Sequence, residues 1–201
     1  VINEMAHLHG MKASVSVRIN PDIDAHTHKY VTTGLYENKF GISNHEFDKL
    51  IEFLQKSEHI GFFGLHFHIG SQITRVEEVF SLECKRVNEI VEYFESKGLT
   101  VKNINLGGGL GVDYDDPDGN PIPDFGTWFQ AIPDNIVRRP DQAVHVEPGR
   151  SLVAQCASLI SRVLFVKSGE TKNFLIMDAG MNDLIRPALY GAYHKIENLS
   201  A

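Results

Sequence analysis

The sequence predicts an α/β protein with a parallel sheet, followed near residue 150 by a β-rich segment. Strand-type and helix-type segments alternate between residues 13 and 146, which is typical of parallel strands joined by helices. After residue 150 the pattern changes to two β-type runs, 151–167 and 172–178, separated by a short turn that predicts a hairpin. We therefore expect an α/β domain over residues 1–150 and the start of a β-rich domain over residues 151–201.

Each element follows from hydrophobic spacing and from turn residues. The expected strands are residues 13–19, 39–42, 60–69, 101–106 and 143–146. A helix over 75–97 is predicted by apolar residues at spacings of three and four, with Gly98 as its cap. Ser43 and Glu46 fit a capping box, which predicts a helix from there to about residue 57. Residues 127–137 predict another helix, and residues 22–33 and 113–126 predict loops.

The two ends of the sequence lack boundary signals. Residues 1–10 are typical of the tail of a helix, with Gly10 as its cap, and residues 194–201 stop without a terminator. We therefore expect the chain to be an internal piece of a longer protein.

Composition excludes several classes of function. The chain has 201 residues, and 19 basic against 26 acidic residues give a net charge of −7. An acidic surface disfavours nucleic acid and anionic membranes as partners, and no apolar run approaches the roughly 18 residues of a membrane helix. Cys84 and Cys156 are too few for a disulfide scaffold. We expect a cytoplasmic setting, with both thiols buried or partly buried.

Three polar motifs each follow a predicted parallel strand. They are the pair His66 and His68, the glycine-rich stretch Gly107–Gly111, and the segment Glu147–Arg150. The carboxyl ends of parallel strands meet at one edge, and this is where open α/β sheets and (β/α)8 barrels form their sites. We therefore expect the three motifs to lie together.

The glycine-rich stretch indicates a phosphate site, because backbone N–H groups unhindered by side chains can approach phosphate closely. A flexible turn is the alternative interpretation. The stretch is not a P-loop, since no Gly-Lys-Ser/Thr follows it. It does not match the dinucleotide pattern either, because Val112 and Tyr114 occupy the positions of the third glycine.

The remaining two motifs each have a functional and a structural interpretation. Glu147 follows an apolar strand, so its carboxylate needs a cation, either Arg150 or the protonated ring nitrogen of a ligand. If the ligand takes Glu147, Arg150 is available for phosphate or carboxylate. His66 and His68 have the spacing of metallohydrolase ligands, although a lone histidine at a strand end is usually a core residue, and an imidazole can also stack on a planar ligand.

Taken together, the motifs resemble the diaminopimelate decarboxylases. The residues that carry the resemblance are Arg18–Pro21, Asn38–Ile42, His68–Gln72, Leu106–Gly111, Glu147–Arg150, Asp178–Asp183 and Arg186–Tyr190. They occur in the order found in that family and cover essentially the whole chain. The resemblance implies part of an alanine-racemase-like (β/α)8 TIM barrel followed by the start of a β-rich C-terminal domain.

The resemblance also implies a cofactor and a reaction. The cofactor is pyridoxal 5'-phosphate, and the reaction is decarboxylation of meso-2,6-diaminopimelate to L-lysine and CO2 by a homodimer with shared active sites. The implied cofactor-binding residues are His68, Ser71, Gly107, Gly108, Gly109, Glu147, Gly149 and Arg150. The implied substrate-binding residues are Arg150, Arg186 and Tyr190.

Two parts of the family's active site have no counterpart here. The Schiff-base lysine would lie before Val1, and Lys39 does not match its position. The family's cysteine-and-glutamate segment would lie after Ala201, and neither Cys84 nor Cys156 matches it. We therefore assign no catalytic residue and no metal ligand to this chain, and we expect it to be inactive alone.

Three alternatives stay open. The protein could be a related barrel decarboxylase acting on ornithine, arginine or carboxynorspermidine. It could belong to a different class, the metal-dependent barrel hydrolases, with His66 and His68 as ligands. It could also be a binding protein for a phosphorylated ligand, without catalysis.

Overall fold

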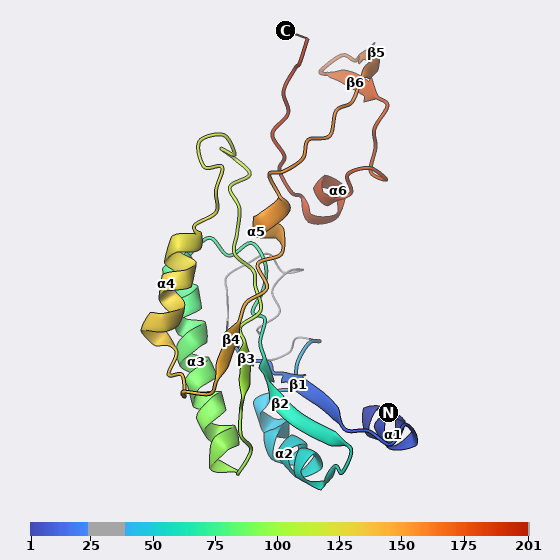
Figure 1. Ribbon diagram of the computed structural model, residues 1–201. Coiled ribbons are helices and arrows are strands. Elements are labelled where there is room, and N and C mark those ends of the chain that lie inside the picture. Colours follow the sequence, from blue (N-terminus) through green and yellow to red (C-terminus); the bar gives the residue numbers. More distant parts are fainter. Residues whose placement is uncertain (24–38, 201) are drawn as a thin grey trace. The chain divides into compact units, whose positions relative to one another are not determined.

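The computed structural model describes residues 1–23 and 39–200 (Figure 1). These residues form two compact units. The first consists of Val1–Gly111 together with Ile122–Leu152, and the second of Val112–Pro121 together with the chain from Val153 onward. Each unit is described separately below.

The first unit is built on a four-stranded parallel sheet. Its strands are β1 (Ala13–Arg18), β2 (Ile60–His66), β3 (Asn103–Asn105) and β4 (Ala143–His145), and their spatial order is β1-β2-β3-β4. The prediction of an α/β chain with parallel strands is confirmed. Because all four strands run the same way, their carboxyl ends lie at one edge of the sheet.

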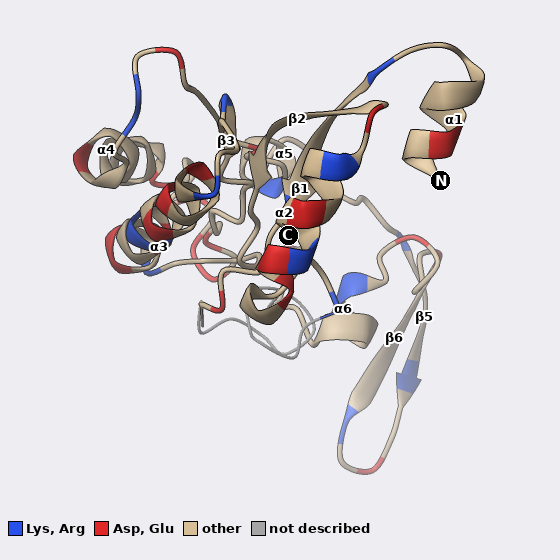
Figure 2. Ribbon diagram, turned by 90° about the horizontal axis from the view of Figure 1, so that it is seen from below, with Lys and Arg blue, Asp and Glu red and all other residues tan. Residues whose placement is uncertain are grey.

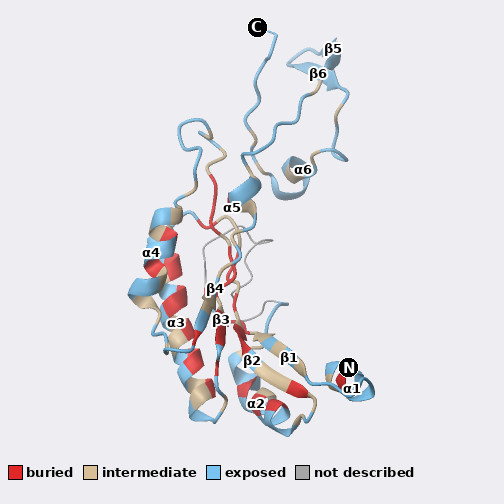
Figure 3. Cartoon of the chain, in the orientation of Figure 1, coloured by how far each residue is buried: buried red, intermediate tan, exposed pale blue. Residues whose placement is uncertain are grey.

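Helices flank these strands along the chain. They are α1 (Ile2–Leu8), α2 (Phe47–Lys56), α3 (Val76–Ser96), α4 (Phe125–Asn135) and the short α5 (Arg150–Val153). The buried residues of α3 recur at spacings of three and four, as predicted, and follow one side of the helix in Figure 3. Apart from the buried Glu83, the acidic and basic residues of α3 occupy other positions (Figure 2). Gly98, with a φ of +86°, follows the end of α3.

The core of the first unit consists of two apolar clusters. The first includes Leu65 of β2, Ile104 of β3 and Phe94 of α3. In the second, Phe80 of α3 lies with its ring centroid 5.3 Å from that of Trp128 in α4. Burying such side chains supplies most of the favourable free energy of folding. The packing of α3 and α4 therefore holds the strands, and with them the strand ends, in place.

Several predicted boundaries were wrong for identifiable reasons. The Ser43 side chain caps no helix: its carbonyl accepts the Glu46 N–H at 2.9 Å instead, in a 3-10 turn, η1 (Asn44–Glu46), that precedes α2. Residues 39–42 form no strand, and only Ile42 makes a single bridge, to Ile19. Helix α4 begins two residues earlier than predicted, because Asp124 caps it by accepting the Thr127 N–H at 3.0 Å.

The second unit contains an antiparallel hairpin and a short helix. Strand β5 (Val163–Ser168) pairs with β6 (Asn173–Met177), and the Gly169 N–H donates to the Lys172 carbonyl at 3.0 Å across the turn. The predicted hairpin is therefore confirmed, although the run predicted to begin at residue 151 forms a strand only from Val163. Both faces of the hairpin are exposed (Figure 3). Helix α6 (Arg186–Tyr190) follows.

The described residues do not include every segment for which the sequence makes a prediction. The expected loop at residues 22–33 lies outside them from residue 24 onward, as does Asn38 of the motif at 38–42. No described helix is both long enough and apolar enough to cross a membrane.

Candidate functional site

The carboxyl ends of the four parallel strands carry polar side chains. β1, β2, β3 and β4 end at Arg18, His66, Asn105 and His145. The segments that leave β2, β3 and β4 hold the three motifs singled out in the sequence, so the topology brings those motifs to one edge of the sheet, as expected.

Asn105 connects the loop after β3 to the segment after β4. Its Nδ2 donates to Glu147 Oε1 at 2.9 Å, and its Oδ1 accepts the Gly107 N–H at 2.8 Å. The Glu147 N–H in turn donates to the Gly107 carbonyl. One amide side chain thereby orients both the Glu147 carboxylate and the first glycine of the stretch.

The glycines are required by close backbone packing. A Cβ on Gly108 would lie 1.8 Å from the Glu147 carbonyl oxygen, which is far inside van der Waals contact. Gly107 has a φ of +68°, and a Cβ there would lie 2.3 Å from the Phe67 carbonyl oxygen. The interpretation of this stretch as a merely flexible turn does not account for such packing.

His68 lies against the glycine stretch. Its Nδ1 accepts the Gly108 N–H at 3.2 Å, so the proton of the neutral imidazole is on Nε2. Burial lowers the pKa of His68, and the positive charge of Arg18 lowers this pKa further. His68 therefore presents a neutral aromatic ring at neutral pH.

Glu147 lies among basic groups. Its Oε2 is 3.7 Å from Nε2 of His66, and that buried nitrogen has no hydrogen-bond partner within the described chain. Burial is also the main cause of the lowered pKa of His66. Arg18 has its pKa lowered by burial and raised by the charge of Glu147, and its guanidinium lies 4.9 Å from the centre of the Phe40 ring.

Arg150 is held by the loop after β2 rather than by Glu147. Its Nη1 donates to Gln72 Oε1 at 3.2 Å, and Gln72 adopts a left-handed conformation with a φ of +65°. Non-glycine residues in this conformation are strained and cluster at functional sites. Ser71, in the same loop, is half-buried, and Gly149 precedes Arg150 with a φ of +59°. The ion pairs found among the described residues do not include one between Glu147 and Arg150.

The predicted substrate residues Arg186 and Tyr190 lie in the second unit. They are the first and last residues of α6, so their spacing of four places them on one face of that helix. Arg186 lies with its guanidinium 4.8 Å from the centre of the Tyr114 ring.

Sequence reasoning gave no role to three residues of this arrangement, Arg18, Asn105 and Gln72, although Arg18 and Gln72 lie in motifs that carry the resemblance. Arg18 and Asn105 are the last residues of their strands, and that position was the available signal. Gln72 could not be found in this way, because its role depends on a backbone conformation that the sequence does not reveal.

The two cysteines differ from each other. Burial raises the pKa of the Cys84 thiol to about 12, so it is unreactive, as expected of a buried thiol. Cys156 is exposed, which corrects the expectation that both thiols are at least partly buried.

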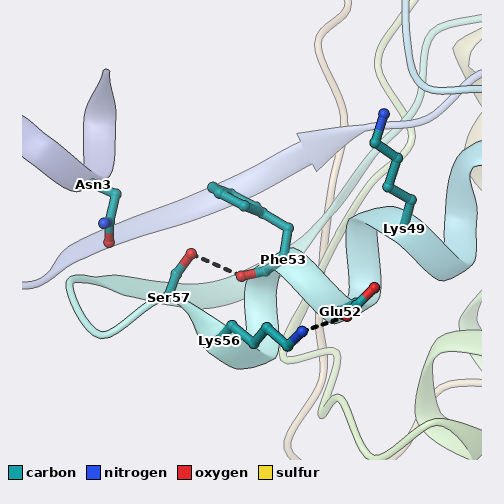
Figure 4. A pocket seen from close by; sticks show the side chains of 6 residues that line it. All are labelled: Asn3, Lys49, Glu52, Phe53, Lys56 and Ser57. Carbon is teal, nitrogen blue, oxygen red and sulfur yellow. Dashed lines mark hydrogen bonds and ion pairs between the residues drawn. The ribbon is translucent and has the colours of Figure 1, made fainter.

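A surface depression of about 400 Å³ lies elsewhere in the first unit (Figure 4). Its lining residues are Asn3 of α1 and Lys49, Glu52, Phe53, Lys56 and Ser57 on or next to α2. None of these residues belongs to the arrangement at the strand ends. Lys56 pairs with Glu52, and Ser57 donates to the Phe53 carbonyl at 2.7 Å, so these three polar side chains are engaged locally.

Among the described residues, no group of three or more His, Cys, Asp and Glu side chains is arranged to hold a metal ion. Within the part of the chain that the structure describes, His66 and His68 therefore have no further ligand of the kind that a hydrolase centre would need.

A parallel α/β sheet with a glycine-rich loop, a carboxylate and a neutral imidazole at its carboxyl edge is typical of proteins that bind a phosphorylated cofactor. The chain belongs to the pyridoxal-dependent decarboxylases: the family model described as "Pyridoxal-dependent decarboxylase, pyridoxal binding domain" matches residues 1–154. Its similar curated relatives include the diaminopimelate decarboxylase of Bacteroides thetaiotaomicron, which is 51% identical over the whole chain. That of Neisseria meningitidis is 43% identical over 98% of the chain. The chain spans 52% and 47% of these two proteins, about half their length.

Solved structures agree with this assignment of fold. The diaminopimelate decarboxylase of Helicobacter pylori, in complex with L-lysine, matches 96% of the chain with a TM-score of 0.85 and 38% identity, over 47% of its own length. The arginine decarboxylase of a Chlorella virus matches 94% of the chain and 49% of its own with a TM-score of 0.73, and at 21% identity this likeness concerns the fold alone. The expected α/β class and the resemblance to barrel decarboxylases are confirmed.

Proposed function

We propose that this chain is part of an enzyme that uses pyridoxal 5'-phosphate to decarboxylate meso-2,6-diaminopimelate to L-lysine and CO2. The names of its similar relatives support this substrate. In this proposal residues 1–150 supply part of the cofactor-binding barrel, and residues 151–201 begin the β-rich domain with its substrate-binding segment.

One observation carries the proposal: Glu147, His68 and the triple glycine are hydrogen-bonded into one arrangement at the carboxyl edge of the sheet. The donor set fits the cofactor. It offers a carboxylate for a ring nitrogen, a flat neutral ring for stacking, and a glycine stretch whose backbone a phosphate can approach closely because it carries no side chains. In this structure the N–H groups of Gly107 and Gly108 donate to Asn105 and His68.

The bound cofactor would supply an electron sink for the carbanion that loss of CO2 leaves behind. Glu147 would hold a proton on the pyridine nitrogen, because an anion beside a base raises the pKa of that base. Asn105 fixes the direction of this carboxylate by donating to Oε1 at 2.9 Å. His68 would keep the plane of the ring fixed, so that the bond to be broken stays aligned with the ring's π system.

The phosphate would be bound by backbone and side-chain donors together. We assign Gly107, Gly108 and Gly109 to it, with Ser71 and Gly149 beside them. Arg150 has a planar fork that suits either the phosphate or a substrate carboxylate, and Gln72 orients it by accepting from Nη1 at 3.2 Å.

Substrate recognition would depend on Arg150, Arg186 and Tyr190. Two arginines suit a substrate with two carboxylates and discriminate against amino acids that lack the distal one. A preference for ornithine, arginine or carboxynorspermidine is the alternative within the same family, and a panel of these substrates with the full-length protein distinguishes them from diaminopimelate.

The substitution Glu147→Gln in the full-length holoenzyme tests the proposal. A neutral amide does not stabilise the protonated ring, so kcat for CO2 release from diaminopimelate should fall about a hundredfold. Glu92→Gln is the matched control, since Glu92 is exposed on α3, and it should leave kcat unchanged. An unchanged kcat in Glu147→Gln would remove Glu147 from this role.

The proposal also covers the cellular compartment and the oligomeric state of the enzyme. We expect a cytoplasmic homodimer with shared active sites. Size-exclusion chromatography with light scattering on the full-length protein measures the oligomeric state, and a monomer with full activity would contradict the shared sites.

A further inference from the structure

The second unit contains a cluster of three half-buried side chains centred on Arg186. The others are Tyr114, from the segment Val112–Pro121, and His194, which follows α6. Nη1 of Arg186 lies 3.2 Å from Nε2 of His194, and its guanidinium carbon lies 4.8 Å from the centre of the Tyr114 ring. The rings of Tyr114 and His194 meet edge to face, with centroids 5.3 Å apart.

The chemistry of the contact fixes the state of His194. A guanidinium can only donate, so Nε2 of His194 must accept, and the imidazole proton is on Nδ1. Burial and the charge of Arg186 both lower the pKa of His194, which keeps the ring in this neutral form. The neighbouring Lys195 is engaged elsewhere, in ion pairs with Asp118 and with Glu197 at 2.6 Å.

The two contacts hold the arginine without using its binding edge. The guanidinium carbon lies over the Tyr114 ring, and His194 accepts a hydrogen bond from Nη1. Neither contact uses the edge formed by Nε and Nη2, which is one of the edges that binds a carboxylate through two parallel hydrogen bonds. An arginine fixed in this way loses less conformational entropy when it binds an anion than a free one does.

From this geometry we infer that Tyr114 and His194 are positioning residues, which hold the Arg186 guanidinium in the orientation that binds a substrate carboxylate. The inference rests on the proposed function, because it takes Arg186 as a substrate-binding residue. It deepens that proposal by adding two residues that do not contact the substrate themselves.

Kinetics of the full-length holoenzyme test the inference. His194→Leu removes the acceptor, so KM for diaminopimelate should rise about tenfold while kcat changes less than about twofold, since binding is weakened equally in ground and transition states. His194→Gln keeps an acceptor oxygen and should restore most of the affinity. A fall in kcat with unchanged KM in His194→Leu would overturn the inference. Equal KM values in the wild type, His194→Leu and His194→Gln would overturn it as well.

A second pair of variants guards against a folding defect in His194→Leu. Tyr114→Phe keeps the ring and should keep the wild-type KM, whereas Tyr114→Leu should raise it. Tyr193→Leu is the matched control, because Tyr193 is exposed in the same segment as His194, and its KM should not change. If Tyr114→Phe and Tyr114→Leu have the same KM, the ring has no positioning role.

Calorimetric titration with pimelate separates this inference from the proposed function. Pimelate has two carboxylates on a chain of the same length as diaminopimelate, and its binding needs no turnover. If the wild-type enzyme does not decarboxylate diaminopimelate, the proposed function fails. Weaker pimelate binding to His194→Leu than to His194→Gln would still support the positioning of Arg186 by His194. Equal pimelate affinity in these variants, or no pimelate binding to the wild-type enzyme, contradicts it.

Discussion

Among the glycines of the candidate cofactor site, Gly108 has the least room for a side chain. Its Cα faces the carbonyl of Glu147, and the space that a Cβ would need is already filled by backbone. Backbone cannot move aside as a flexible side chain can, so the identity of this residue is set by packing as well as by ligand access.

Gly108→Ala in the full-length protein should therefore destabilise the fold by about 1–3 kcal/mol and weaken cofactor binding. Gly126→Ala is the control: its Cβ would lie 3.7 Å from the nearest atom, an Asp124 oxygen, which is ordinary contact. Urea denaturation and fluorescence titration with pyridoxal 5'-phosphate measure both effects. Wild-type stability and affinity in Gly108→Ala would show that the loop after β3 can shift freely.

At this scale the sequence predicted which residues meet, but not how they are connected. His68, the glycines and Glu147 could be found because each follows a strand, and parallel topology brings strand ends together. The hydrogen bonds through Asn105 depend on side-chain directions that no pattern of residue types specifies. For the same reason the sequence left open whether Arg150 pairs with Glu147, whereas the structure pairs it with Gln72.

Helix α3 carries an ionisable group in its buried face. Glu83 is fully buried, and neither of its carboxylate oxygens has a hydrogen-bond partner in the described part of the chain. Burial raises the pKa of Glu83 well above its usual value, so the folded protein keeps this carboxyl protonated to a higher pH than the unfolded chain does. The other buried residues of α3 are apolar or cysteine, so burying the Glu83 carboxyl among them costs free energy of folding.

The pH dependence of stability follows from the direction of this pKa shift. Below about pH 4 the carboxyl is protonated in both the folded and the unfolded states, so its titration adds no pH dependence there; as the pH rises, only the unfolded state releases the proton freely, so the fold loses stability. Glu83→Met in the full-length protein should therefore stabilise the fold more at pH 7 than at pH 4.

Urea midpoints at the two pH values measure this difference, with Glu92→Met, at an exposed position of the same helix, as the control. A gain in stability that is the same at pH 4 and pH 7 would show that Glu83 acts through packing and not through its proton.

Element boundaries could be predicted where periodicity is long and could not where a turn competes. The 21 residues of α3 were predicted to within one residue at each end, because six turns of apolar spacing leave little ambiguity. The Ser43 carbonyl instead accepts the Glu46 N–H in a 3-10 turn. A pattern of residue types cannot distinguish that turn from a side-chain cap.

For the whole molecule, the decisive quantity is how much of the active site this chain contains. It spans about half the length of its curated relatives, at 52% of the Bacteroides protein. In addition, we assign none of its lysines to the bond with the cofactor.

The 201-residue chain expressed alone with added pyridoxal 5'-phosphate should accordingly release no CO2 from diaminopimelate. The full-length protein, assayed in parallel, is the positive control. Sustained release by the chain alone, above that of free cofactor, would contradict the prediction and would point to a lysine within these residues.

The strand order β1-β2-β3-β4 is the same as the order of the strands along the chain. Every strand after β1 therefore finds its neighbour among residues that the ribosome has already made. Only one intervening connection has to close at each step, and the entropy lost in closing it grows slowly with its length. This four-stranded sheet can consequently assemble strand by strand during translation, in the direction of synthesis.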